Sequence, residues 1–412
     1  MRQCEVAVIG AGPAGLAAAV AAYDRGARDV VILDREAHPG GVLNQCIHPG
    51  FGLHRLGQEL TGPEYAAWDE RAVRERSIPI LTGTTVLSLS RDRVIKATGG
   101  QGIFHLKAKS VVLAMGCRER SRGALRIPGS RPAGIYSAGT AQKWMNCEGF
   151  SVGKRVVILG SGDIGLIMAR RMALSGATVL EVCEVMPYSG GLRRNIVQCL
   201  EDFGIPLHLS TTVAQIHGRE RLEGVTLVQV DSDRRPIPGT ERYLSCDTLL
   251  LSCGLIPENE LTRAAGILLE PKTGGATVNE LGETEAEGIF ACGNVLHVHD
   301  LVDYVSAEAE RAGRGAADFA LGKTEKMPRV ETRAGEGIRY VIPQRIPQQG
   351  ETTLFFRVAS PVKNGAFVCR CGGRVLTRRP FLSAAPGEME KLVLPAEGLR
   401  EEGVEVFMEV KK

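Results

Sequence analysis

The stretch GAGPAGLAAAVAAYDRGARDVVILD, residues 10–34, decides the fold of this chain. An apolar run at residues 5–9 precedes its glycines, and an alanine-rich segment follows them to about Arg25. A second apolar run, residues 30–33, then ends at Asp34. This order predicts strand, glycine turn, helix and strand, the context in which G-x-G-x-x-G binds a dinucleotide. The glycines allow the backbone to approach a pyrophosphate, and the helix N-terminus offers unpaired N–H groups.

The same order recurs in GSGDIGLIMARRMALSGATVLEVCE, residues 160–184, after an apolar run at residues 155–159. In both copies the first glycine and the acid are 24 positions apart. A single glycine turn can be vestigial, but strand, spacing and acid agree in both copies. We therefore expect two sites for two dinucleotides.

Further strands that end in glycine support two such units. Residues 110–116 (SVVLAMG) and 247–254 (DTLLLSCG) are apolar on both faces, as buried parallel strands are. Residues 288–294 (GIFACGN) predict another strand and turn, and residues 304–321 predict a helix. This last part follows the second unit in the chain but is needed to complete the first.

The segment at residues 326–412 has a different character. Alternating runs separated by Pro and Gly predict strands at 339–342, 353–358, 366–371, 374–378, 391–394 and 404–410. Gly372 and Gly373 between two of them predict a two-residue hairpin. We expect an appended antiparallel β domain.

Composition narrows the class of protein. The 412 residues include 50 Lys and Arg against 47 Asp and Glu, which argues against a chain built to hold nucleic acid or a membrane surface. The N-terminus shows no secretory leader, and no apolar run reaches the roughly 20 residues of a membrane span. The 11 scattered cysteines are typical of reduced thiols. We expect a soluble, cytoplasmic protein with a small-molecule or protein partner.

The two glycine turns, the AMG strand end, Gly40 with Gly41 and the GIFACGN segment together resemble the pyridine nucleotide-disulfide oxidoreductase superfamily over residues 4 to about 322. The resemblance implies an α/β chain with two Rossmann-like dinucleotide-binding domains, for FAD and NAD(P)H, and a C-terminal antiparallel β domain. The implied boundaries are 1–120 with 285–325 for a discontinuous FAD domain, 121–284 for the NAD(P)H domain and 326–412 for the β domain.

Three longer motifs resemble one sub-branch. They are GGVLNQCIHPGFG (40–52), GIYSAGTAQ (134–142) and PGEMEKLVLP (386–395). They look like FAD/NAD oxidoreductases that accompany a glycerol-3-phosphate-dehydrogenase-like flavoprotein and a small cysteine-rich protein. More distantly, they resemble the smaller flavin subunits of opine dehydrogenase and hydrogen cyanide synthase.

The resemblance also implies the cofactor-binding residues. For FAD these are Gly10, Gly12, Pro13, Ala14, Gly15, Asp34, Arg35, Gly41, Val42, Asn44, Met115, Gly116, Gly293, Asn294 and Val302. For the nicotinamide nucleotide they are Gly160, Gly162, Asp163, Ile164, Gly165, Glu184 and Gly254. Asn294 stands where the family has Asp, which puts FAD affinity in question. Glu184 predicts NADH over NADPH because an acid repels a 2′-phosphate, although Arg193 and Arg194 lie nearby in sequence.

Cys46 and His48 are the candidate catalytic residues. Disulfide reductases carry two cysteines after the Gly-Gly, whereas only Cys46 is present here, so an internal disulfide relay is disfavoured. Cys46 is either a packing thiol or a residue that cycles through a sulfenic acid or mixed disulfide. His48 is either a proton donor beside the flavin, a base for Cys46, or a turn histidine.

The H-V-H-D run of His297, His299 and Asp300 invites a metal interpretation. It precedes a helix whose N-terminus faces the flavin in the family, so we expect Asp300 or Asp303 to cap that helix instead. Cys369 and Cys371 have no C-x-x-C partner and indicate a packed pair. We assign no metal site.

The expected activity is hydride exchange between NADH and FAD, with electrons passing to or from a partner flavoprotein or iron–sulfur subunit. An alternative is a single-cysteine NADH oxidase, peroxidase or CoA-disulfide-type reductase using Cys46. Another is a non-catalytic redox sensor or scaffold that binds FAD and NADH. A tract without acids, residues 353–386, could dock an acidic partner or lie on solvated strands, and the β domain could instead form a homodimer.

Overall fold

The computed structural model describes residues 2–325, 327–395, 399 and 402–410. The chain divides into two compact units, Met1–Cys117 with Pro257–Lys412, and Arg118–Ile256. The two crossings between them contain β9 (Cys117–Glu119) and β18 (Leu255–Pro257), which pair with each other. The first unit is therefore assembled from both ends of the chain.

The first unit contains a mainly parallel sheet at its centre. Its order is β5 (Ile80–Leu81), β2 (Val30–Leu33), β1 (Arg2–Ile9), β8 (Gly102–Leu113), β7 (Val94–Gly99) and β6 (Thr85–Leu89), and β19 (Ile289–Ala291) pairs with β8. The pairing of β19 is parallel, with Ile289 opposite Val111. The GIFACGN segment thus returns to complete the first sheet, as predicted.

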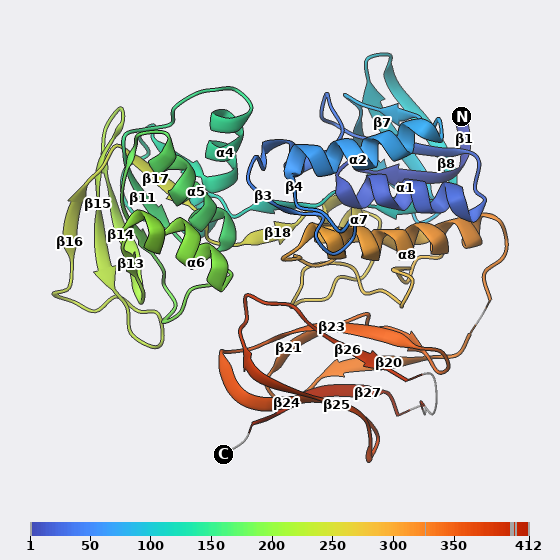
Figure 1. Ribbon diagram of the computed structural model, residues 1–412. Helices are drawn as coiled ribbons and strands as arrows, with labels where there is room; N and C mark the ends of the chain where they lie inside the picture. Colours follow the sequence, from blue (N-terminus) through green and yellow to red (C-terminus); the bar gives the residue numbers. More distant parts are fainter. Residues whose placement is uncertain (1, 326, 396–398, 400–401, 411–412) are drawn as a thin grey trace. The chain divides into compact units, whose positions relative to one another are not determined.

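Two helices far apart in sequence lie side by side in this unit, α1 (Pro13–Arg25) in blue and α8 (Val302–Ala320) in orange (Figure 1). Their alanine-rich faces bury into one hydrophobic core with the sheet. Gly313 makes the close approach possible, since a Cβ there would lie 2.2 Å from the carbonyl oxygen of Ala18. The remaining elements are η1 (Gly41–Gln45), β3 (Pro49–Phe51), β4 (Leu60–Thr61), α2 (Gly62–Glu75), α7 (Glu260–Ala264) and η3 (Gly293–Val295).

The second unit repeats the parallel architecture and adds an antiparallel sheet. The parallel order is β10 (Ile135–Ser137), β17 (Thr248–Leu251), β11 (Arg155–Leu159), β12 (Thr178–Cys183) and β13 (Leu207–His208). The antiparallel sheet is β14 (Thr211–Gly218), β15 (Leu222–Gln229) and β16 (Arg242–Ser245). The helices are α3 (Arg122–Leu125), α4 (Ala138–Asn146), α5 (Asp163–Leu174), α6 (Arg193–Cys199) and η2 (Glu201–Phe203).

The C-terminal segment forms two further sheets within the first unit. One runs β22 (Arg345–Pro347), β20 (Arg329–Ala334), β27 (Val404–Val410), β24 (Val362–Cys371) and β25 (Arg374–Ala384), and the other β21 (Ile338–Ile342), β23 (Thr352–Val358) and β26 (Glu390–Leu394). Cys371 pairs with Arg374 across Gly372 and Gly373, which confirms the predicted hairpin. All pairings are antiparallel except that of β20 with β27. The alternating runs did not reveal β20 and β22.

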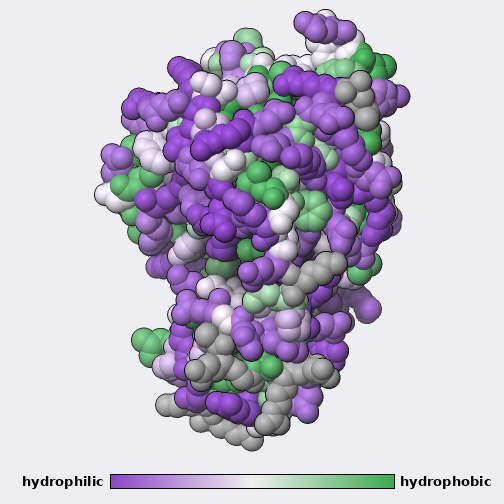
Figure 2. Space-filling view, turned by 90° about the vertical axis from the view of Figure 1, so that its right-hand side faces the viewer, coloured by the Kyte–Doolittle hydropathy of each residue, from purple (hydrophilic) through white to green (hydrophobic). Residues whose placement is uncertain are grey.

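The surface is mostly hydrophilic on the face drawn in Figure 2, where apolar areas are small and separated. No helix within the described ranges is long and apolar enough to cross a membrane. Among the described residues, none of the 11 cysteines forms a disulfide.

Candidate active site

The first glycine turn has the three properties that a pyrophosphate-binding loop needs. Gly10 has φ of 108°, and a Cβ there would lie 2.4 Å from the carbonyl oxygen of Ala114. A Cβ on Gly15 would lie 1.7 Å from the carbonyl oxygen of Gly10. At Gly12, by contrast, a Cβ would meet no protein atom within 4 Å. The first and third glycines are needed for packing, whereas the middle one leaves an open cradle at the N-terminus of α1, which fits the FAD pyrophosphate.

The acid after β2 is tied to this turn. The carboxylate of Asp34 accepts a hydrogen bond from the N–H of Ala11 and another, at 2.8 Å, from the N–H of Glu36. These bonds hold the carboxylate beside the glycine turn, where a ribose of the bound dinucleotide is expected. The neighbouring Arg35 is exposed, and its Nε lies 3.9 Å from Oε1 of Glu36.

The second unit builds its turn in the same way. A Cβ on Gly160 would lie 2.1 Å from the carbonyl oxygen of Ser252, and one on Gly165 would lie 2.6 Å from that of Gly160. The nearest atom to a Cβ on Gly162 would be 3.8 Å away. Both glycine turns therefore keep an open middle position.

Glu184 occupies the position that corresponds to Asp34. Its Oε2 accepts hydrogen bonds from the N–H of Ser161 at 2.9 Å and from the hydroxyl of Ser161 at 2.7 Å. Its Oε1 accepts from the N–H of Met186 at 3.0 Å. Both carboxylate oxygens are thus held by hydrogen bonds at the end of β12, and Glu184 is largely buried.

Asp163 connects the start of α5 to the start of α6, the helix that carries Arg193 and Arg194. Its Oδ1 accepts from the N–H of Leu192 at 2.8 Å and from the amide of Asn195 at 2.6 Å. The exposed side chain of Arg193 pairs with Glu201 at 3.2 Å. The other two predicted residues of this unit are Ile164, half-buried in α5, and Gly254, whose φ of 101° places it in the glycine-favouring region.

The Gly-Gly loop of the first unit lies against the glycine turn. The N–H of Gly40 donates to the carbonyl oxygen of Ala11 at 2.8 Å, and a Cβ on Gly41 would lie 3.0 Å from the Cα of Gly12. The η1 turn that follows exposes Val42 and Asn44. The amide of Asn44 donates to the carbonyl oxygen of Pro39 at 2.8 Å.

Cys46 and His48 follow directly after η1. The thiol of Cys46 donates to the carbonyl oxygen of Val42 at 3.3 Å. The ring of His48 lies 5.1 Å from the ring of Phe51. Both side chains are half-buried.

The GIFACGN segment (288–294) places two further predicted FAD residues, Gly293 and Asn294, near the first glycine turn and the AMG strand end. A Cβ on Gly293 would lie 2.8 Å from the Cβ of Ala14, at the start of α1 next to Pro13. The amide of Asn294 donates to the sulfur of Cys117 at 3.6 Å, while its Oδ1 accepts from the N–H of His299 at 3.0 Å. Cys117 directly follows Met115 and Gly116, so Asn294 joins the AMG strand end to the returning segment.

The predicted capping of α8 by Asp300 or Asp303 is wrong. The N-cap residue is Leu301, which makes no side-chain capping bond. Asp300 instead accepts hydrogen bonds from Arg357 and from the N–H of Met389. Asp303 accepts from the N–H groups of Gly52 and Arg55. Both carboxylates thus hold distant segments instead of the helix end.

The helix itself begins at the predicted Val302. Its partly buried side chain packs against a small cluster of Leu43, Tyr65 and Ala66. The sequence offered no sign of these contacts because their members lie about 240 residues apart.

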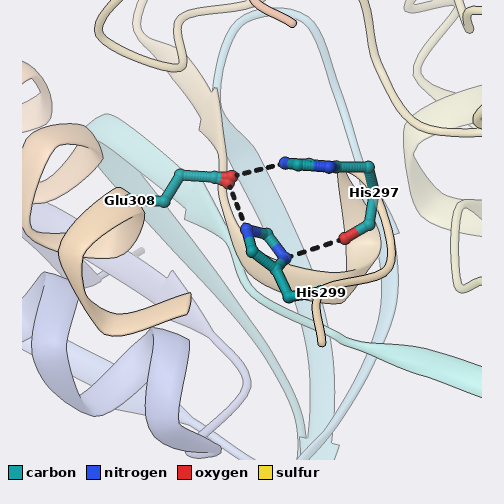
Figure 3. A group of neighbouring side chains, drawn as sticks. All are labelled: His297, His299 and Glu308. Atoms are coloured by element: carbon teal, nitrogen blue, oxygen red, sulfur yellow. Dashed lines mark hydrogen bonds and ion pairs between the residues drawn. The ribbon is translucent and has the colours of Figure 1, made fainter. Parts of the chain in front are cut away.

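Two histidines before α8 meet a glutamate within it. Nε2 of His297 lies 3.2 Å from Oε2 of Glu308, and Nε2 of His299 lies 3.3 Å from Oε1 (Figure 3). Burial lowers the pKa of His297 to about 4. The two imidazoles hold the pKa of Glu308 well below its usual value, although burial acts in the opposite direction. Asp300 of the H-V-H-D run takes no part in this cluster, and no pattern in the sequence pointed to Glu308.

Arginines in the acid-free tract of the C-terminal segment form ion pairs with acids from other parts of the chain. Arg370 pairs with Glu405 of β27 at 2.6 Å, Arg378 pairs with Glu409 at 3.2 Å, and Arg379 pairs with Glu390 of β26. Arg357 is buried with Asp300. These four arginines are therefore paired with carboxylates that lie outside the tract in sequence, and docking of an acidic partner on the tract stays a prediction.

A family model described as pyridine nucleotide-disulphide oxidoreductase matches residues 4–314. An opine oxidase subunit of Agrobacterium tumefaciens (strain Ach5) is 28% identical over 341 residues, which cover 77% of this chain and 65% of that protein. The ferredoxin reductase component of chlorobenzene dioxygenase of Cupriavidus sp. (strain PS12) is 29% identical over 344 residues, covering 79% of this chain and 76% of that protein. An alkyl hydroperoxide reductase subunit of Xanthomonas campestris pv. phaseoli is 27% identical over 329 residues, covering 77% and 57%. The chain thus spans less than two thirds of the first and third of these relatives.

Among solved structures, thioredoxin reductase of T. acidophilum has a TM-score of 0.65 and 24% identity, covering 78% of this chain and 100% of that one. This likeness concerns the fold alone. Together with the family match, it confirms the predicted α/β class with Rossmann-like units.

Proposed function

This chain belongs to the pyridine nucleotide-disulphide oxidoreductase family, and on that premise we propose that it exchanges a hydride between NADH and FAD and passes electrons to or from a partner protein. Membership confirms the expected class, an FAD-dependent NAD(P)H oxidoreductase, and the expected cofactors at the level of FAD and NAD(P)H. The choice of NADH, the partner, the cytoplasmic location and the glycerol-3-phosphate-dehydrogenase-like sub-branch are proposals.

One observation carries the proposal: the two units build the same turn, each with an open middle glycine and an acid bonded to the residue between the first two glycines. A chain with one such turn would bind one dinucleotide. Two turns of matching construction support one site for FAD and one for a nicotinamide nucleotide.

The chain's own residues bind and orient in this mechanism. Bound FAD supplies the hydride chemistry. The open cradle at Gly12 and the N–H groups at the start of α1 hold a pyrophosphate, and Asp34 holds a ribose. In the second unit, Gly162 and Glu184 take the corresponding roles for NADH. Asn294 would orient the AMG strand end beside the flavin through Cys117.

Two relatives support a partner for the electrons. The opine oxidase relative is by its name one subunit of an enzyme, and the ferredoxin reductase is one component of a dioxygenase. We therefore propose that this chain works with a flavoprotein or an iron–sulfur subunit, with a homodimer as the alternative assembly.

A second candidate is a peroxidase-like or disulfide-type reaction at Cys46, with His48 as its proton donor or base. The similarity to the alkyl hydroperoxide reductase relative favours this candidate. Only one cysteine follows Gly40 and Gly41, so the internal disulfide relay of the disulfide reductases is disfavoured.

The test uses the purified full chain. FAD released by denaturation should amount to one per chain by mass spectrometry, and NADH should reduce artificial dyes much faster than it reduces oxygen, peroxide or disulfides. A folded protein that neither carries nor takes up FAD would refute the proposal. Turnover that requires peroxide or disulfide would support the second candidate instead. Negligible turnover with every acceptor would identify a sensor or scaffold.

A further inference from the structure

We propose that His297, His299 and Glu308 form a binding site for one divalent transition-metal ion, of which Zn²⁺ is the test case. The three side chains are not among the residues assigned to the two dinucleotide sites, although the backbone N–H of His299 donates to Asn294. It goes against the expectation of no metal site, because Glu308 lies outside the H-V-H-D run that suggested a metal.

The donor atoms are already gathered. One donor atom from each of the three residues lies within 4.8 Å of the other two. Nε2 of His297 lies 3.2 Å from Oε2 of Glu308 and Nε2 of His299 lies 3.3 Å from Oε1, close to the roughly 3.3–3.5 Å between neighbouring ligands of a tetrahedral zinc site.

The ring of His299 is oriented as metal-binding histidines are. Its Nδ1 lies 3.0 Å from the carbonyl oxygen of His297 (Figure 3). That oxygen can only accept, so Nδ1 is the donor in this arrangement, and the other ring nitrogen, Nε2, faces Glu308. A metal-bound histidine commonly donates its other N–H to a backbone carbonyl in this way.

An imidazole nitrogen and a carboxylate oxygen are both ligands that a zinc-type ion accepts, so an ion held between Nε2 of His299 and Glu308 would bind both. The ring of His297 adds a second observation: it is 2% exposed, and its Nδ1 has no hydrogen-bond partner among the described residues. An unpaired polar atom in the interior costs free energy. The buried position of the His297 ring is therefore stabilised through its other nitrogen, Nε2, which faces Glu308.

The surrounding charges permit a cation. Arg357 acts electrostatically on His297 and is paired with Asp300, while Arg311 of α8 acts electrostatically on Glu308. Glu308 itself supplies one negative charge to the site. Two imidazoles with one carboxylate select zinc-type ions over Ca²⁺ and Mg²⁺, which prefer oxygen ligands. We infer a structural role, in which the ion ties the segment before α8, including Asn294, to the helix.

The experiment measures metal binding directly. The holoprotein is dialysed against a chelator, then against Zn²⁺ alone, and its metal content is determined by mass spectrometry. We expect one Zn²⁺ per chain in the wild type, and binding more than about a hundredfold weaker in His299→Gln and Glu308→Gln, because loss of a ligand costs more than the 10–100-fold of an outer-shell change. His105→Gln, which alters an exposed histidine of β8, is the matched control and should bind as the wild type does.

Two further readouts keep the proposal testable if the variants fold poorly. In the wild type, Zn²⁺ should raise the Tm while Mg²⁺ at the same concentration should not. Co²⁺ in place of Zn²⁺ should give the visible absorption of a four-coordinate nitrogen and oxygen site. Less than a tenth of an equivalent of Zn²⁺ in the wild type, or equal binding by folded His299→Gln, would overturn the proposal.

Discussion

Glu184 accepts a hydrogen bond from the backbone N–H of Ser161, the residue between the first two glycines of the second turn, at 2.9 Å. Asp34 does the same with Ala11 in the first turn. In each unit, the acid at the end of the second strand is thus hydrogen-bonded to the glycine turn that follows the first strand. An acid held in this way can meet a ribose without reorganising, so it serves structure and recognition together.

The glycines within one turn should respond differently to a single methyl group. Gly12→Ala places its Cβ in open space, so we expect unchanged stability of the cofactor-free protein and FAD affinity at least about tenfold weaker. Gly15→Ala places its Cβ 1.7 Å from a backbone oxygen and should prevent folding of the unit. Thermal unfolding and FAD titration check both. Normal FAD binding by Gly12→Ala would show that the pyrophosphate does not bind at Gly12.

Replacing Glu184 should change cofactor choice. Glu184→Gln keeps an acceptor for the bonds from Ser161 but loses the charge that repels a 2′-phosphate, so the preference for NADH over NADPH should fall by about tenfold, or ~1.4 kcal/mol. The ratio of kcat/KM for the two cofactors measures it. The matched change is Arg193→Gln, at an exposed arginine paired with Glu201. If that variant shifts the ratio more than Glu184→Gln does, the arginine sets specificity.

Cys46→Ser should leave NADH-to-dye transfer largely intact, because hydride transfer to the flavin needs no thiol. Cys147→Ser, at an exposed cysteine of the second unit, controls for handling of the protein. Both variants are assayed with dye and with peroxide. If Cys46→Ser keeps its FAD but loses nearly all dye reduction, the result would support the thiol-based reaction at Cys46 instead.

The buried pair of Arg357 and Asp300 should matter far more for stability than the exposed pairs of the same strands. Arg357→Met leaves Asp300 with no cation in a site where its side chain is 14% exposed, which should cost about 3–5 kcal/mol in urea unfolding. Arg378→Met breaks the exposed pair with Glu409 and should cost less than about 1 kcal/mol. Similar costs for the two variants would show that the link between β23 and the segment before α8 carries little energy.

Asp69 should give the protein a measurable pH dependence. Burial raises the pKa of Asp69 from 3.8 to about 6, although Arg55 opposes the shift. The folded state therefore binds this proton more tightly than the unfolded state, so the contribution is complete below about pH 4 and is lost as the pH rises through 6. Relative to Asp69→Asn, the wild type should lose on the order of 1 kcal/mol of unfolding free energy between pH 5 and pH 7.5. Asp24→Asn, at an exposed carboxylate paired with Arg76, controls for the loss of an ion pair.

The sequence by itself determined the parallel units and their glycine turns. Periodicity, glycine spacing and the acid at the strand end are local properties, and the observed α1, β2, β11 and α5 follow the predicted segments closely. The hairpin at Gly372 and Gly373 was equally local. Each of these features depends on backbone conformation within about 25 residues, which the residue types set directly.

Only the tertiary structure decided which distant side chains meet. Glu308 of α8 lies beside His297 and His299 of the preceding segment, whereas the sequence run placed only Asp300 next to the two histidines. Arg357 of β23 pairs with Asp300, 57 positions away. Such contacts depend on how separate elements pack. The chemistry of a side chain indicates which charge its partner has, but not where in the sequence that partner lies. For this reason the two nucleotide turns were predictable, whereas the buried cluster and the neutralised arginines were not.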